Sequence, residues 1–293
     1  MSIGVQLVAN GIVAGSAYSL LGISFGLIYS TARFFHFAYG GIYTAAAYAA
    51  YLTFVVLHLP FGLSLALAVT CAACLGVLCQ TMVYQPLRRR GSGPASLLVA
   101  SLGLFVVMQS VVSLGFGDAT RVLRSGGLGS VAVFGALITP IQIAVIVTNL
   151  VMCAVVWLAV QFTRIGRATR AVADDVELSR IAGVNVERVI VIVFAVGSAL
   201  AAVAAILASL DTDMRPTMGF EALLMGVVAA VIGGTGSIPG AFVGGMFLGL
   251  AQQIGVWRLP TAWQDAIAFC LLILCLIFRP QGVFGLPLRR TRI

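Results

Sequence analysis

The sequence has few charged residues and no lysine. Of its 293 residues, 9% are charged and 61% are hydrophobic, whereas an average soluble domain has about 25% charged residues. This composition excludes a soluble globular protein and leaves no room for a separate soluble domain. All 17 basic residues are arginine, so the chain lacks the lysine of a GxxxxGK[ST] phosphate-binding loop. Any ATP-driven activity therefore requires a separate ATPase.

Residues that bind metals or perform catalysis are also scarce. The chain has two histidines, and its six cysteines all lie in apolar segments. Cys71 and Cys74 form a CxxC pair, but neither a second pair nor nearby histidines accompany it, as a zinc or redox site would require. We interpret the cysteines as small buried hydrophobic side chains. We expect no metal site and no catalytic residue, because an intramembrane enzyme needs a nucleophile, base or metal cluster at depth.

Long apolar segments predict an all-α polytopic membrane protein, since about 20 apolar residues span a bilayer. Seven segments are long enough: Val5–Ile28, Phe37–Leu57, Gly62–Tyr84, Ala95–Phe116, Ile141–Phe162, Val189–Leu210 and Trp263–Phe278. A further region, Ala222–Val256, is interrupted at Gly233–Gly240 and predicts two shorter helical arms, which either cross twice or form a re-entrant loop. The prolines are expected at or beyond helix ends. We expect a single domain, residues 1–293, of about 8–9 transmembrane or half-membrane helices.

The arginines predict the orientation, because short cytoplasmic loops are enriched in basic residues. With the N-terminus outside, four arginines fall outside: Arg121, Arg124, Arg215 and Arg258. Thirteen fall inside: Arg33, Arg88, Arg89, Arg90, Arg164, Arg167, Arg170, Arg180, Arg188, Arg279, Arg289, Arg290 and Arg292. The net charge of +8 thus fits cytoplasmic loops and anionic lipids rather than nucleic acid. No basic residue precedes Arg33, so we expect no cleaved signal peptide.

The middles of the predicted spans carry no charged residue. His36, His58, Glu221 and Asp265 all lie near span ends. A proton- or sodium-coupled transporter keeps ionisable groups near the bilayer centre, so the sequence disfavours such coupling. A passive channel remains compatible with the uncharged interiors.

Glycines recur at four-residue spacing in two regions. The first span has Gly11, Gly15, Gly22 and Gly26, and the interrupted region has Gly236, Gly240 and Gly244. This spacing is typical of closely packed membrane helices. The alternative for Gly233–Ser237 is a backbone-lined solute passage, since interrupted helices are tolerated where they line a cavity.

The loop Thr163–Arg188 reads TRIGRATRAVADDVELSRIAGVNVER. We expect a short helix outside the bilayer, with Asp174 capping its start, Glu177 three residues later and Gly183 ending it. Its mixed apolar and charged surface fits the groove of a partner protein. The alternative is a solvated loop that only satisfies the positive-inside rule.

Five stretches, in this order, resemble the permease subunits of branched-chain amino acid ABC importers of the LivH-like type, and the resemblance covers nearly the whole chain. They are FFHFAYGGIYTAAAYAAYL (Phe34–Leu52), VYQPLRRRGSGPASLLVASLGL (Val83–Leu104), GRATRAVADDVELSRIAGVNVERV (Gly166–Val189), GFEALLMGVVAAVIGGTGSIPGAFVGGMFLG (Gly219–Gly249) and DAIAFCLLILCLIFRPQGVFG (Asp265–Gly285).

The resemblance implies a multi-pass subunit of the bacterial inner membrane. In such a membrane, the orientation predicted from the arginines puts the N-terminus in the periplasm and the C-terminus in the cytoplasm. Its implied partners are a second related permease, two cytosolic ATPase subunits that bind ATP and magnesium, and a periplasmic solute-binding protein. This chain would hold no cofactor. The loop would enter the ATPase groove, and its coupling residues are Asp174, Asp175, Glu177, Leu178, Ile181 and Gly183.

The resemblance leaves the transported solute open. The family commonly has asparagine at the position of His36, and histidine or glutamine at that of Tyr39, so FHFAYGG is a variant motif. His36 is alternatively a membrane-interface histidine. The residues considered for the solute pathway are His36, Tyr39, Gly40, Gly234, Thr235, Gly236, Ser237 and Gln252. The alternative function is a passive urea or amide facilitator, which has no use for a docking loop. A heterodimer and a homodimer of permeases both remain open.

Overall fold

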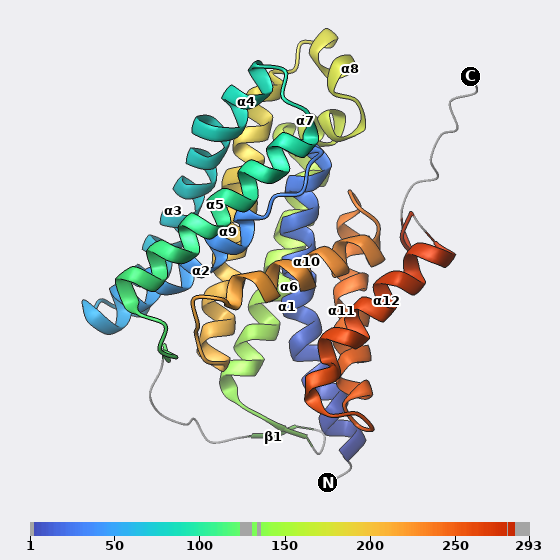
Figure 1. The fold of residues 1–293 in the computed structure, drawn as a ribbon. Helices are drawn as coiled ribbons and strands as arrows, with labels where there is room; N and C mark the ends of the chain where they lie inside the picture. The colour runs from blue at the N-terminus through green and yellow to red at the C-terminus, as the bar shows by residue number, and fades with distance from the viewer. Residues whose placement is uncertain (1–2, 124–130, 134–135, 280, 285–293) are drawn as a thin grey trace. The chain divides into compact units, whose positions relative to one another are not determined.

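The computed structural model describes residues 3–123, 131–133, 136–279 and 281–284. Its α-helices are α1 (Ile3–Ala32), α2 (Ala38–Tyr51), α3 (Phe61–Leu78), α4 (Gln85–Arg89), α5 (Pro94–Phe116), α6 (Pro140–Phe162), α7 (Arg164–Asp174), α8 (Val176–Ile181), α9 (Val186–Asp211), α10 (Met218–Gly233), α11 (Ile238–Gly255) and α12 (Gln264–Phe278) (Figure 1). Two π-helical segments, η1 (Leu52–Val56) and η2 (Cys79–Tyr84), follow α2 and α3, and a 3-10 turn, η3 (Thr261–Trp263), precedes α12.

A short antiparallel hairpin accompanies the helices. Strand β1 (Val131–Val133) pairs with β2 (Ala136–Ile138), with Ala132 opposite Leu137. The hairpin was not predicted, because two three-residue strands are too short to show an alternating pattern.

The predicted class, an all-α polytopic membrane protein, is confirmed. Within the described residues, six helices are long and apolar enough to span a membrane, and the count reaches seven when α10 and α11 are taken as one broken span. These two helices are bent by 118° at their junction, so the predicted interruption is present. The 14-residue helix α2 is not among the six.

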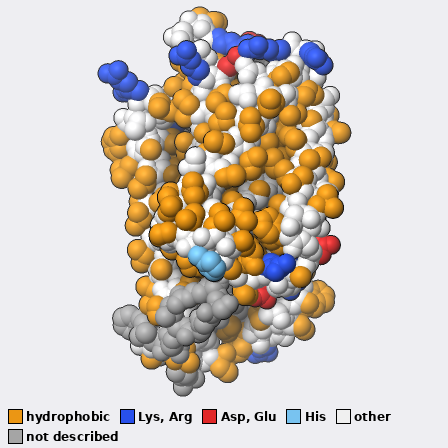
Figure 2. Space-filling model, turned by 90° about the vertical axis from the view of Figure 1, so that its left-hand side faces the viewer, with side chains coloured by type: hydrophobic (Ala, Val, Ile, Leu, Met, Phe, Trp, Pro, Cys, Tyr) orange, Lys and Arg blue, Asp and Glu red, His pale blue; other side chains and the backbone are white. Residues whose placement is uncertain are grey.

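The surface agrees with a membrane environment. Figure 2 shows hydrophobic side chains over most of the displayed face, and most of the basic side chains on this face lie at one end. Exposed apolar residues include Leu63 and Leu67 on α3 and Val106, Val107 and Val111 on α5. Such a surface is unfavourable in water and favourable against lipid.

The chain divides into two compact units, and unit 2 comprises residues 27–128 and 154–224. Its central element is α2, which packs against α3, α5 and α9 (Figure 1). Helix α3 buries Ser64, Ala68, Ala72 and Gly76. This four-residue spacing forms a stripe of small side chains that lets α3 approach α9 closely, and a Cβ at Gly76 would overlap the hydroxyl of Ser198.

Unit 1 comprises residues 1–26, 129–153 and 225–293. Here α1 crosses α11 at glycines: a Cβ at Gly15 would lie 3.0 Å from the Cα of Met246, and one at Gly249 would overlap the backbone of Gly15. At Gly22, a Cβ would lie 2.9 Å from the Cβ of Ala229 on α10. The glycine spacing therefore serves helix packing on α1 and α11, as predicted.

Two sequence-based expectations are wrong. Pro86 does not end a helix but lies within the continuous helical stretch Phe61–Arg89. The π-helical segment precedes it, where the Gln85 N–H bonds the Gln80 carbonyl five residues back, and this widened ladder accommodates a residue without an N–H. Cys71, Cys74 and Cys270 are exposed on helix faces rather than buried, whereas Cys79 and Cys153 are buried. Pro280 and Pro287 lie outside the described residues.

Candidate functional site

The predicted docking helix consists of two helices, α7 and α8. Thr163 caps α7 by accepting a hydrogen bond from the Gly166 N–H at 3.0 Å. Asp175 caps α8 by accepting from the N–H groups of Glu177 and Leu178 at 2.8 and 2.9 Å. The expectation that Asp174 is the cap is wrong, because Asp174 ends α7. Asp175 has the extended backbone (φ −150°, ψ 116°) that is typical of an N-cap residue.

Gly183 ends α8, as predicted. It has a φ of +81°, a left-handed conformation that glycine adopts without strain. Its N–H bonds the carbonyl of Arg180, and the N–H of Val184 bonds that of Ser179, both at 3.0 Å. This pair of bonds is the Schellman arrangement, which satisfies carbonyls left free at a helix end. Both ends of α8 are therefore capped.

The six predicted coupling residues are all exposed. Leu178 and Ile181 are 64% and 83% exposed and lie three residues apart, so they share one face of α8. Asp174, Asp175, Glu177 and Gly183 are also exposed. The described chain thus presents two large apolar side chains on a short capped helix, and three exposed carboxylates lie on this helix or directly before it.

Two contacts, at Gly166 and Arg170, hold α7 against the end of α6. The Arg170 guanidinium donates to the Gln161 side chain at 3.0 Å and to its carbonyl at 3.3 Å. A Cβ at Gly166 would overlap the Val160 carbonyl, so only glycine permits this approach. The end of α7 receives another arginine, since Arg33 donates to the carbonyls of Ala173 and Asp174.

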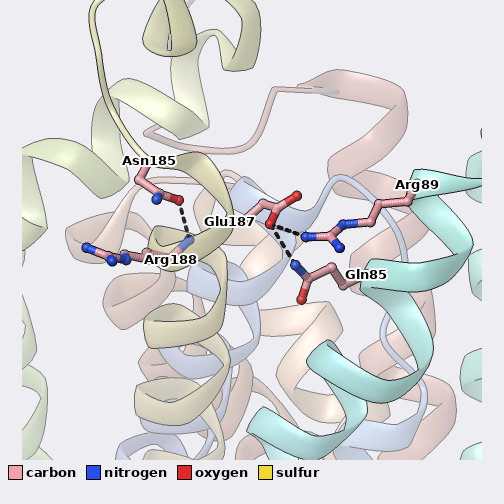
Figure 3. Close-up of polar contacts among 5 residues, drawn as sticks. All are labelled: Gln85, Arg89, Asn185, Glu187 and Arg188. Carbon is pink, nitrogen blue, oxygen red and sulfur yellow. Dashed lines mark hydrogen bonds and ion pairs between the residues drawn. The ribbon is translucent and has the colours of Figure 1, made fainter.

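The exit from the loop is held by a second set of contacts, shown in Figure 3. Asn185 caps α9 by accepting from the Arg188 N–H at 3.1 Å. Glu187, in the first turn of α9, accepts from Arg89 at 2.8 Å and from Gln85 at 2.7 Å. In the sequence, Arg33 and Arg89 indicate only the orientation, and no pattern marks Gln85 or Glu187.

Three of the residues considered for the pathway lie in unit 2. His36 is buried, and its Nδ1 lies 3.0 Å from the Tyr84 hydroxyl. It precedes α2, outside the spanning helices, and burial lowers its pKa from the ordinary value. Tyr39 is buried, and Gly40 contacts the backbone of Gly219 so closely that a Cβ would lie 2.5 Å from its carbonyl oxygen.

The other five lie in unit 1, and four of them form the junction of α10 and α11. Gly234 and Gly236 have φ values of +104° and +98°, Thr235 is exposed, and Ser237 caps α11 through the Gly240 N–H at 3.2 Å. Gln252 lies about 22 Å along α11 from Ser237 at 1.5 Å per residue, and it donates to the Gln264 carbonyl at 3.1 Å. The structure therefore does not bring Gln252 to the junction.

The chain segment after α12 contacts this junction. The N–H groups of Val283 and Phe284 bond the carbonyls of Ile232 and Gly233 at 2.9 and 3.0 Å. These carbonyls belong to the end of α10, where intrahelical partners are missing. The two bonds therefore cap the end of α10. This favours a packing role for Gly233–Ser237 over a role as a backbone-lined solute passage.

Comparisons with known proteins place the chain in a family. It matches the family described as "Branched-chain amino acid transport system / permease component" over residues 7–276. It is 32% identical over 297 residues to the high-affinity branched-chain amino acid transport system permease protein BraD of Pseudomonas aeruginosa, covering 96% of each chain. It is 33% identical over 297 residues, with the same coverage, to the permease protein LivH of Escherichia coli (strain K12).

A solved structure shares the fold. It is titled "PsaBC from Streptococcus pneumoniae in complex with Fab" and matches with a TM-score of 0.55 at 10% identity, covering 95% of this chain and 92% of that chain. The chain is a multi-pass permease component of the inner membrane, and it belongs to the family of branched-chain amino acid transport system permease components, as the five sequence motifs indicated.

Proposed function

We propose that this chain forms the membrane passage of an ATP-driven importer for branched-chain amino acids or a related small polar solute. Its relatives BraD and LivH are named as high-affinity branched-chain amino acid permeases, which supports this class of solute. A periplasmic binding protein delivers the solute, a second related permease completes the passage, and two cytosolic ATPase subunits bind ATP and magnesium.

The exposed helix α8 is the observation that carries this proposal. A six-residue helix is too short to be stable alone, yet α8 is capped at both ends and directs Leu178 and Ile181 outward. An apolar pair with adjacent carboxylates is suited to a groove on a partner protein. A passive facilitator has no use for this feature, so the proposal favours an importer over a urea or amide channel.

In the proposed mechanism, ATP binding closes the two ATPase subunits and displaces α8. The displacement passes through α7 and the start of α9 to the spanning helices, which open alternately to each side. The chain performs no bond chemistry. Its contribution is a passage and a mechanical connection.

The orientation that we propose has the N-terminus in the periplasm and the C-terminus in the cytoplasm. In unit 2, contacts join Arg33, Arg88 and Arg89 to segments whose arginines are predicted inside. Arg121 forms a β-bridge with Met214, beside Arg215, and both arginines are predicted outside. These groupings support the assignment of sides by arginine count.

We propose that the start of α10 and the end of α11 lie on the same side of the membrane. The end of α11 contacts the start of α12 through Gly255 and Ile267, while the segment after α12 reaches the junction at Gly234. Helices α11 and α12 thus run in opposite directions within unit 1. With α2 included, nine helices of the described residues span or partly span the membrane in this proposal.

The experiment is to purify the tagged chain gently from its native membrane and identify the proteins that remain bound by mass spectrometry. We expect ABC ATPase subunits and a second permease, and ATP-dependent uptake of labelled leucine when the complex is reconstituted with its binding protein. Recovery of this chain alone under conditions that preserve a known importer, together with leucine uptake without ATP, would establish a facilitator instead.

A further inference from the structure

We propose that Arg33 and the Arg89–Glu187 pair are positioning residues that hold the end of α7 and the start of α9, the segments on either side of α8, to the rest of unit 2. We call these contacts the α8 anchors: Arg33 with the carbonyls of Ala173 and Asp174, and Glu187 with Arg89 and Gln85. The proposal rests on the proposed function, because the anchors carry the motion that ATPase subunits impose on α8.

The first anchor lies between α1 and α2. Arg33 has a left-handed backbone with φ 58°, and its N–H closes the last turn of α1 on the Tyr29 carbonyl at 2.9 Å. Glycine and asparagine are the usual residues in this conformation, because other side chains are strained there. The guanidinium donates to the last carbonyls of α7, which lack intrahelical partners and form the negative end of that helix. The strained arginine thus provides a contact that glycine cannot.

The second anchor joins α4 to the first turn of α9. Glu187 accepts from Arg89 and Gln85 at 2.8 and 2.7 Å (Figure 3). The side chains of Arg89 and Glu187 are 66% and 48% exposed, and exposed pairs contribute little to folding stability. This anchor therefore affects the position of the α9 start more than the stability of the fold.

The two anchors share one support. Arg88, next to Arg89, donates to the Ala32 carbonyl at 3.1 Å, and its guanidinium lies 5.5 Å from the ring centre of Phe34. Arg88 thus joins α4 to Ala32 and Phe34, the two residues that flank Arg33. Between the anchors, the chain changes direction at Asp175 and Gly183, so α8 would pivot there if either anchor were lost.

Hydrogen–deuterium exchange of the purified full chain in nanodiscs tests the anchors without any partner. Arg33→Asn keeps a residue that tolerates the left-handed conformation but cannot reach α7. Arg89→Glu places two carboxylates together. The matched control is Arg90→Asn, because Arg90 is exposed and its side chain has no hydrogen bond or ion pair to the described residues. We expect amide exchange in residues 164–184 to rise about fivefold or more in the first two variants and to stay unchanged in the control.

A charge exchange provides the rescue. Arg89→Glu combined with Glu187→Arg restores an opposite-charge pair, and we expect exchange rates within about twofold of the original protein. Unchanged exchange in Arg33→Asn and Arg89→Glu would overturn the proposal. Equal exchange rates in the single variant and the charge-exchanged variant would also overturn it, because the pair would then have no role.

The second measurement is the number of ATP molecules hydrolysed per labelled leucine imported by the reconstituted complex. We expect this ratio to rise about threefold or more in Arg33→Asn and Arg89→Glu, at unchanged recovery of ATPase subunits, and to return in the charge-exchanged variant. Faster exchange with an unchanged ratio would overturn the coupling role of the anchors. If no ATPase is recovered with the original chain, the proposed function fails, whereas the exchange measurement still decides whether the anchors hold α8.

Discussion

Individual glycines determine how closely the membrane helices approach one another. At the α1–α11 crossing, a Cβ at Gly249 would overlap the backbone of Gly15, and one at Gly245 would overlap that of Ser19. Ser19 uses this proximity to donate a hydrogen bond to the Phe242 carbonyl at 2.7 Å. Close backbone approach of this kind replaces the hydrophobic driving force that is missing between helices in lipid.

The substitution Gly249→Ala tests this crossing. The added methyl group must push α1 and α11 apart, so we expect a loss of about 1–3 kcal/mol in the free energy of unfolding, measured by thermal denaturation in detergent. Gly103→Ala is the matched control, since a Cβ there meets no atom within 4 Å, and it should not destabilise. Equal stability of the two variants would contradict the packing role of Gly249.

The two neighbouring aspartates of the loop are distinguished by their hydrogen bonds. We expect Asp175→Ala to destabilise α8 by about 1 kcal/mol through loss of its N-cap, seen as faster amide exchange in residues 176–181. Asp174→Ala should leave this exchange unchanged, because the Asp174 side chain does not cap α8. The opposite ranking would show that Asp174 is the cap.

At the level of elements, the junction of α10 and α11 depends on a distant segment. Gly282 has a φ of +78°, and a Cβ there would overlap the backbone of Gly234. This close contact allows Val283 and Phe284 to cap the end of α10. The junction is thus closed by residues that follow α12.

Gly282→Ala should therefore destabilise the protein by more than backbone strain alone. Gly91→Ala is the matched control, because Gly91 has a φ of +75° and an open position, so it isolates a strain cost of about 1 kcal/mol. We expect Gly282→Ala to cost about 1–3 kcal/mol more, measured as the difference in unfolding free energy in detergent. Equal costs would show that the segment does not contact the junction closely.

The sequence predicted those elements that have a local signal. Apolar segments predicted the long helices, and glycines with Pro239 predicted the interruption before α11. The division into α7 and α8 was missed because Asp174 and Asp175 are equally good cap residues, and only the extended backbone of Asp175 distinguishes them. The Val283–Ile232 contact and the α8 anchors were missed because they join residues far apart in the sequence, for which one sequence carries no signal.

At the scale of the whole molecule, the arginines and the contacts of unit 2 agree on one side of the membrane. Arg33 and Arg89 bind residues within the loop 163–188, and Arg170, which lies in this loop, binds Gln161 just before it. A cytosolic ATPase would meet these elements together. The proposed orientation therefore places every proposed coupling residue on the side of the proposed ATPase subunits.

Reporter fusions test this orientation. A green fluorescent protein fused after Ile293 should fluoresce, because the C-terminus is proposed to be cytoplasmic. Alkaline phosphatase inserted after Asp118 should be active, because that loop is proposed to be periplasmic. A dark C-terminal fusion together with an inactive insertion would reverse the orientation and remove α8 from the cytoplasm.

Recovery of ATPase subunits with variants of α8 tests the central claim most directly. The change is Leu178→Asp with Ile181→Asp, compared with Arg90→Asn and the original chain, each purified gently from native membranes. We predict that the α8 variant keeps the second permease but loses most of its ATPase subunits, because charged residues replace the apolar pair proposed to enter their groove. Equal recovery of ATPase subunits with all three chains would contradict the role of α8 as the docking helix.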